Sequence, residues 1–296
     1  MLWRLAPPEA RAVLASFAYS RSVMSLRTTT GGSAIWARAR QSLRLAVDIA
    51  RRAMFGRYRE TMLGAAWSVI QPLIMLVIYA FVFSQVFEAR WDVETERPVS
   101  FAVILFSGLL LFNFFNESLV NATSVILNNS TLIKRTGVAS ATMPVSVVLA
   151  ALFNLGLSAI PFLIAYFVTT GVPPVTTLAL PLVLVPLILM VMGLVFIVAS
   201  MSVFVRDMQP LVIILSSLVL FLSPIFYPES AIPEQFRGLV LLSPIGVPLS
   251  ASKELLFLGV LPKWGPLAVY TLVAVVILLI GSLLFRKAQR GFADVL

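Results

Sequence analysis

The sequence contains neither cysteine nor histidine in its 296 residues. Without cysteine there can be no disulfide, thiol nucleophile or thiolate metal site, and without histidine there is no imidazole base, Ser-His-Asp triad or histidine-ligated metal. A membrane-embedded glycosyltransferase or acyltransferase would need a convergent base and often acidic metal ligands, whereas the acids of this chain are scattered. We therefore expect no enzyme activity, metal or cofactor in this chain.

Lysine is also scarce. The four lysines are Lys134, Lys253, Lys263 and Lys287. None of them follows a glycine, so the phosphate-binding loop GxxxxGK[ST] is absent. If the protein uses ATP, another chain must bind it.

Charged residues make up only 12% of the chain, 59% is hydrophobic, and the mean hydropathy is +0.98. These values are typical of a polytopic membrane protein. Six apolar runs are long enough, or nearly so, to cross a hydrocarbon core of about 30 Å, which takes about 20 helical residues. The runs are residues 65–87, 101–127, 145–169, 178–203, 211–227 and 266–285. We predict an all-α protein with six transmembrane helices.

The basic residues orient this bundle. A net charge of +9 would suggest a nucleic-acid partner in a soluble chain, but here the basic residues flank the apolar runs. With the N-terminus inside, the inner segments hold 17 of the 22 basic residues, as the positive-inside rule expects. We therefore predict cytoplasmic N- and C-termini and no nucleic-acid partner.

Before the first span lie a basic extension, residues 1–41, and an amphipathic segment, residues 42–63. Prolines interrupt any signal-peptide core in the extension, and residues 28–33 (TTTGGS) are typical of a linker. On a helical wheel one sector of the amphipathic segment holds Arg44, Asp48, Arg51, Arg52 and Arg59. Such a helix lies in the headgroup layer, with its arginines on anionic lipid or on a protein partner. It is either a juxtamembrane anchor or a coupling element for the six-span domain at 64–296.

Residues 223–265, between spans five and six, fit no simple loop. The segment is strongly apolar, but its apolar runs are too short to span and prolines break them repeatedly. Chain of this kind is stable at membrane depth only against protein or beside a wet cavity. We predict short outer re-entrant helices that form a movable gate, with Phe226, Tyr227 and Pro228 at its mouth. The alternative is an interfacial hairpin that only caps the bundle.

One acid, Glu117, lies inside an apolar run. A carboxylate at that depth is costly, so it should face the bundle interior or a wet cavity. Glu117 either lines a lumen or has a structural role, or it belongs to a proton relay, although no second intramembrane acid or base accompanies it.

Four stretches of the chain, in this order and on a six-span frame, resemble the membrane subunit of type-2 bacterial polysaccharide-export ABC transporters. This group exports lipid-linked O-antigen or teichoic acid chains. The stretches are RYR, LGAAW, QPL and VFS within 57–84, SGL, FNFF and LIK within 107–134, RD and SPIFYP within 206–233, and FADVL at 292–296. The resemblance covers roughly residues 40–296. The chain departs from the family at Ser243, where an asparagine usually precedes the proline, and at 135–138, where a Tyr-Phe-Pro type of stretch usually stands.

The resemblance implies a homodimer in the bacterial cytoplasmic (inner) membrane, paired with two copies of a separate ATPase that binds ATP and Mg²⁺. It also implies a role in lipopolysaccharide biosynthesis or teichoic acid export, a conduit for a lipid-linked glycan between the two membrane subunits, and outer gate helices. A glycan conduit needs aromatic rings for sugar C–H groups and polar side chains for hydroxyls. The expected conduit residues in span two are Phe112, Asn113, Phe114, Phe115, Asn116 and Glu117. The alternative for these phenylalanines is lipid-facing filler or an interfacial belt.

The inner connections 128–143 and 206–210, together with the amphipathic segment, are the expected docking surfaces for the ATPase. The expected ATPase-coupling residues are Arg51, Arg52, Arg57, Arg59, Lys134, Arg135, Arg206 and Asp207. The alternative is that these basic residues are only positive-inside anchors and that Asp207 starts the next helix. For the whole chain, the competing functions are a capsule-polysaccharide or small-molecule type-2 ABC permease and a proton-coupled flippase.

Overall fold

The computed structural model describes residues 32–57, 62–82, 100–131, 141–227, 232, 234–236, 238 and 243–292. Within these residues all regular secondary structure is helical and no strand occurs. The prediction of an all-α protein is confirmed for the described part of the chain.

Four helices are long and apolar enough to cross a membrane. They are α4 (Phe101–Asn128), α6 (Thr142–Thr169), α7 (Leu180–Met201) and α11 (Trp264–Ala288), and each lies within a few residues of a predicted run. Two further apolar helices, α3 (Trp67–Phe81) and α8 (Met208–Leu222), have 15 residues each. At 1.5 Å per residue these two are about 22 Å long, which is less than a hydrocarbon core of about 30 Å.

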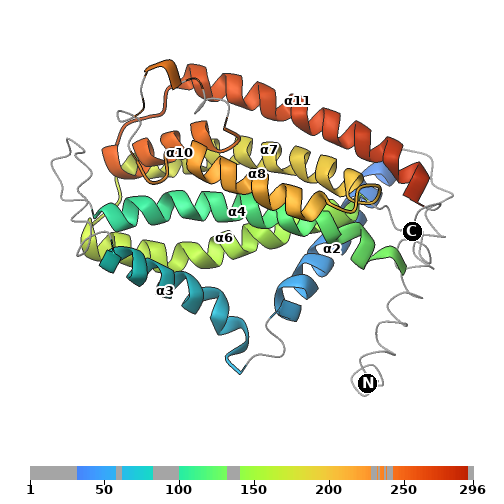
Figure 1. The fold of residues 1–296 in the computed structure, drawn as a ribbon, viewed down its shortest axis with the longest axis horizontal. Helices are drawn as coiled ribbons and strands as arrows, with labels where there is room; N and C mark the ends of the chain where they lie inside the picture. The colour runs from blue at the N-terminus through green and yellow to red at the C-terminus, as the bar shows by residue number, and fades with distance from the viewer. Residues whose placement is uncertain are drawn as a thin grey trace.

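The long helices lie side by side in one bundle (Figure 1). Helix α7 packs against α11 on one side of the bundle, and α4 packs against α6, α7 and α8 in the middle. In the most apolar stretch of α4, 78% of the residues are buried, whereas in that of α11 only 22% are buried. Helix α4 is therefore the central helix of the subunit, and α11 presents most of its surface outward.

Helices α7 and α11 meet through two glycines. A Cβ atom added at Gly281 would lie 2.3 Å from the backbone oxygen of Gly193, and one added at Gly193 would lie 2.7 Å from the backbone nitrogen of Leu278. No side chain fits at either position. Small residues at helix crossings are how membrane helices bring their backbones close enough for extensive van der Waals contact.

Helix α2 (Gly32–Arg57) is the predicted amphipathic helix, but it begins ten residues before Ser42 and includes part of the expected linker. Its charged side chains Arg44, Asp48, Arg51 and Arg52 are exposed. Part of the apolar side is buried within the protein, because Ala46 and Ala50 are buried and α2 packs against α6. Alanine has a short side chain, so these two positions allow the close contact, while Leu43 and Val47 remain exposed.

The described part of residues 223–265 contains short helices: η7 (Glu234–Phe236), α10 (Gly246–Lys253) and the π-helical turn η8 (Glu254–Leu258). Helices α10 and η8 are fixed to their surroundings by side-chain hydrogen bonds to backbone oxygens. The Tyr166 hydroxyl of α6 donates to Leu256, the Tyr270 hydroxyl of α11 to Pro244, and the Thr176 hydroxyl to Leu255.

Ser243 adds a hydroxyl–hydroxyl contact of 2.7 Å with Ser223, at the end of α8. The part of the segment from Ser243 to η8 is therefore built into the bundle at both of its ends.

Candidate functional site: a polar groove on helix α4

One face of α4 is polar along its whole second half. Its side chains are Asn113, Asn116, Glu117, Asn121, Ser124 and Asn128. They recur at intervals of three and four residues, which places them on one side of an α-helix. All six are exposed or half-buried, whereas most of the neighbouring apolar positions of α4 are buried in the core.

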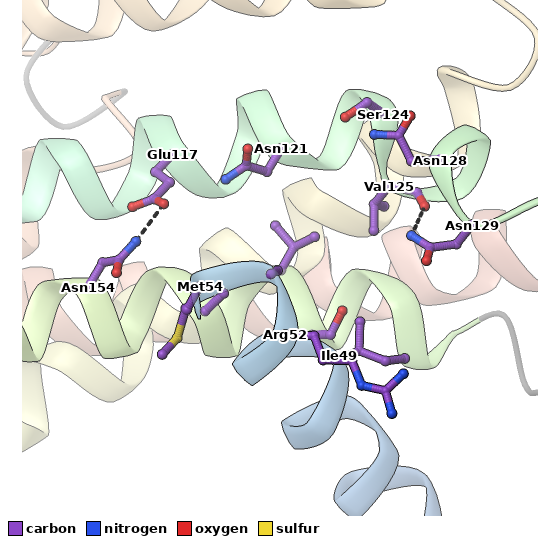
Figure 2. A pocket seen from close by; sticks show the side chains of 14 residues that line it. Ile49, Arg52, Met54, Glu117, Asn121, Ser124, Val125, Asn128, Asn129 and Asn154 are labelled. Carbon is purple, nitrogen blue, oxygen red and sulfur yellow. Dashed lines mark hydrogen bonds between the residues drawn. The ribbon is translucent and has the colours of Figure 1, made fainter. Parts of the chain in front are cut away.

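Two adjoining pockets lie over this face. The larger, about 440 Å³, is bounded by Ile49, Arg52 and Met54 of α2 and by polar residues of α4 and α6 (Figure 2). The smaller, about 300 Å³, is bounded by α3 and by α4, with Gln71 and Tyr79 among its polar residues. Glu117 and Asn154 line both pockets. We call the two pockets together the α4 groove.

Glu117 and Asn154 meet at the junction of the two pockets. The Asn154 amide of α6 donates a hydrogen bond of 2.7 Å to Glu117 Oε1 (Figure 2). A hydrogen bond that crosses from one helix to another fixes the direction of both side chains. Glu117 is half-buried and lines both halves of the groove, while its carboxylate also accepts a hydrogen bond from α6.

The groove is rich in amides and poor in charge. Among the described residues that line it, Arg52 and Glu117 carry charge, and the other polar side chains are amides and hydroxyls. Each amide offers both donors and acceptors, so the groove suits a ligand that is itself dense in hydroxyl groups.

The predicted conduit residues divide into two groups. Asn113, Asn116 and Glu117 line the α4 groove. The rings of Phe112, Phe114 and Phe115 point into the subunit core and are at most 8% exposed. Of these six residues, the two amides and the carboxylate are therefore the ones that a ligand in the groove can contact. The three aromatic rings pack in the core on the other side of α4.

Sequence reasoning missed the residues that other helices bring to the groove. Asn154 comes from α6, and Gln71 and Tyr79 come from α3. The spacing of three and four residues between the polar side chains of α4 could have predicted that Ser124 and Asn128 lie on the same face as Glu117. No comparable pattern marks Asn154, which stands alone among apolar neighbours.

The predicted gate residues lie just after α8. The rings of Phe226 and Phe221 stack with centroids 6.2 Å apart, and the Tyr227 hydroxyl donates to the backbone oxygen of Phe221 at 2.9 Å. Pro228 lies outside the described residues.

The predicted coupling residues that can be placed are exposed. Arg51 and Arg52 lie on α2, and Arg206 and Asp207 lie in the turn between α7 and α8. This turn lies at the same end of the bundle as the last residues of α4 and of α11 (Figure 1). The Arg57 side chain and the residues Arg59, Lys134 and Arg135 lie outside the described part of the chain.

Residues 47–257 match the protein family described as ABC-2 type transporter. This match covers more than half of the chain, and the chain belongs to that family.

Curated relatives match over almost the same length. The O-antigen export system permease protein RfbA of Klebsiella pneumoniae is 25% identical over 254 residues, which cover 85% of this chain and 95% of the relative. The O-antigen export system permease protein RfbA of Myxococcus xanthus is 28% identical over 253 residues, which cover 84% of this chain and 94% of the relative.

Proposed function

We propose that this chain is the membrane subunit of an ABC exporter that moves a lipid-linked polysaccharide of the O-antigen type across the bacterial inner membrane. The observation that carries the proposal is the match to O-antigen export permeases along at least 84% of the chain, within a family of ABC transporters. In the proposed topology α3 and α8 complete a six-span bundle, and the short helices α10 and η8 re-enter the membrane from outside.

The proposed assembly is a homodimer with two copies of an ATPase that binds ATP and Mg²⁺. The exposed charges of Arg206 and Asp207, at one end of the bundle, and of Arg51 and Arg52 on α2 support a docking role. Both termini are placed in the cytoplasm in this topology, on the same side as the ATPase.

The proposed route for the glycan is the α4 groove. Amide side chains at membrane depth are stable only beside water, protein or a polar ligand. A passing polysaccharide offers hydroxyls in place of that water, so the amides can exchange one set of hydrogen bonds for another. The buried phenylalanines of α4 give the groove a rigid floor.

The proposed outer gate is centred on Phe226, Tyr227 and Pro228. The hydrogen bonds of Tyr166, Tyr270 and Thr176 to the region from Pro244 to η8 support a fixed frame there, so we assign the movement to the chain just after α8.

The groove is tested by filling it. Asn121→Trp and Asn113→Trp should abolish export of the cell-surface glycan. Export is measured by gel electrophoresis and immunoblotting with an antiserum against the glycan, in cells whose native gene is deleted. Leu272→Trp is the matched control, because Leu272 is 67% exposed on α11, away from the groove. Normal export by both groove variants at normal membrane abundance would refute the route.

A small-molecule permease is the second candidate. The two pockets, about 440 and about 300 Å³, fall in the size range of sites for drug-sized ligands. Loss of drug resistance on gene deletion, with the surface glycan unchanged, would favour this candidate over glycan export.

A further inference from the structure

Among the described residues that line the α4 groove there is one carboxylate, Glu117, and it lies where the two pockets adjoin, because it lines both of them. A ligand that extends from the larger pocket into the smaller one passes this carboxylate. The Asn154 amide donates the 2.7 Å hydrogen bond that positions this carboxylate, and the carboxylate accepts it.

A carboxylate in such a place discriminates by charge. It accepts hydrogen bonds from neutral sugar hydroxyls. It repels carboxylate or phosphate groups, and this repulsion is stronger in a groove with low-dielectric walls than in bulk water.

The other charged residue among the described lining is Arg52, at the α2 side of the larger pocket. It can attract an anionic group to that pocket. It does not line the smaller pocket, where Glu117 is the charged side chain among the described lining residues.

We propose that Glu117, positioned by Asn154, is a charge filter that admits uncharged glycans to the α4 groove and disfavours chains with repeated carboxylates or phosphates. The inference rests on the proposed function, because it takes the groove as the route of the glycan. It narrows the substrate class from polysaccharides in general to neutral polysaccharides.

The absence of native cysteine allows a direct test in membrane vesicles from cells that express the full-length chain. Asn121→Cys and Asn113→Cys each place a thiol one helical turn from Glu117, in the larger and the smaller pocket. Their labelling rates are measured with two methanethiosulfonate reagents, one carrying a trimethylammonium group and one a sulfonate. Val175→Cys is the reference position, because Val175 is 82% exposed and has no charged residue within 30 positions along the chain.

We expect the cation-to-anion rate ratio at both groove thiols to exceed that at the reference by about tenfold, as a nearby unit charge in a partly desolvated site implies. Glu117→Gln should lower the ratio at least about threefold at both groove thiols. Glu117→Asp should keep it, since the charge remains. An unchanged ratio in Glu117→Gln would overturn the inference. If that variant does not accumulate, raising the ionic strength from about 0.1 to about 1 M, which shortens the Debye length from about 10 to about 3 Å, must lower the ratio at both groove thiols, or the inference fails.

Oligosaccharide probes test the glycan side of the inference. A neutral maltohexaose should slow labelling of the Asn121→Cys thiol more than a hexagalacturonate does, and Glu117→Gln should remove the difference. Equal protection by the two probes with Glu117 present would refute the filter, as would no protection by either. Export of the surface glycan, measured in the same cells, reports on the proposed function separately. If export is normal but Glu117→Gln changes neither the labelling ratio nor the protection by the probes, the charge filter is refuted and the proposed function is not.

Discussion

Replacing Gly281 by alanine should separate two helices that now touch through their backbones. The added Cβ would lie 2.3 Å from the Gly193 oxygen and 3.3 Å from Ile197 Cγ1, whereas ordinary contact begins at 3.4 Å. Helices α7 and α11 must therefore move apart by about 1 Å, which forfeits a quarter to a half of each contact's van der Waals energy along the crossing.

Overpacking of this kind costs about 1–3 kcal/mol, and a clash with backbone belongs at the upper end because no rotamer relieves it. Alanine recovers up to about 1 kcal/mol through its higher helix propensity. The net loss is about 2 kcal/mol, which corresponds to a fall in Tm of roughly 4–8 °C for a chain of this size. Thermal unfolding of purified protein in detergent, followed by tryptophan fluorescence at a fixed scan rate, measures the change.

Gly156→Ala is the matched control, because Gly156 also lies in a long apolar helix but has no atom within 4 Å of the added Cβ. It should leave Tm unchanged or raise it slightly. Gly193→Ala should behave like Gly281→Ala, since its Cβ would meet the backbone of α11 at 2.7 Å. If Gly281→Ala unfolds at the same temperature as Gly156→Ala, the close crossing of α7 and α11 is refuted.

Three further outcomes can be measured. Tyr166→Phe leaves the buried Leu256 oxygen without its donor and should cost about 1–3 kcal/mol, seen as a lower Tm, whereas a Tm equal to wild type would show that this hydrogen bond does not hold η8. Arg206→Ala combined with Asp207→Ala should reduce co-purification of the ATPase without changing Tm, and undiminished co-purification would remove this turn from the docking surface. A disulfide that ties Tyr227 to α4 should stop export until it is reduced, and export at the normal rate while tied would show that the segment after α8 is a passive cap.

The long helices were predictable because a run of about 20 apolar residues has few alternatives in a membrane. The start of α2 was not, because Gly32 and Ser33 are typical of a linker although the helix begins with them. The direction of Phe114 and Phe115 was also beyond the sequence. An apolar side chain of a membrane helix can face lipid, a lumen or the protein core, and only the packing of α4 against its neighbours decides among them.

The hydrogen bond between Glu117 and Asn154 shows the same limit at the site. The two residues are 37 positions apart, on different helices, and no local pattern pairs them. The sequence did indicate that a carboxylate inside an apolar run needs a polar partner or water.

The polar face of α4 is expected to lower the stability of the folded chain relative to an apolar face. Helix α4 is the most buried of the long helices, and apolar residues in place of Asn113, Asn121 and Asn128 would pack at least as well against lipid or protein. Amides at this depth cost free energy unless each donor and acceptor is satisfied. Their alignment into one groove, beside a carboxylate that accepts a hydrogen bond from Asn154, is what the proposed glycan route requires of this helix.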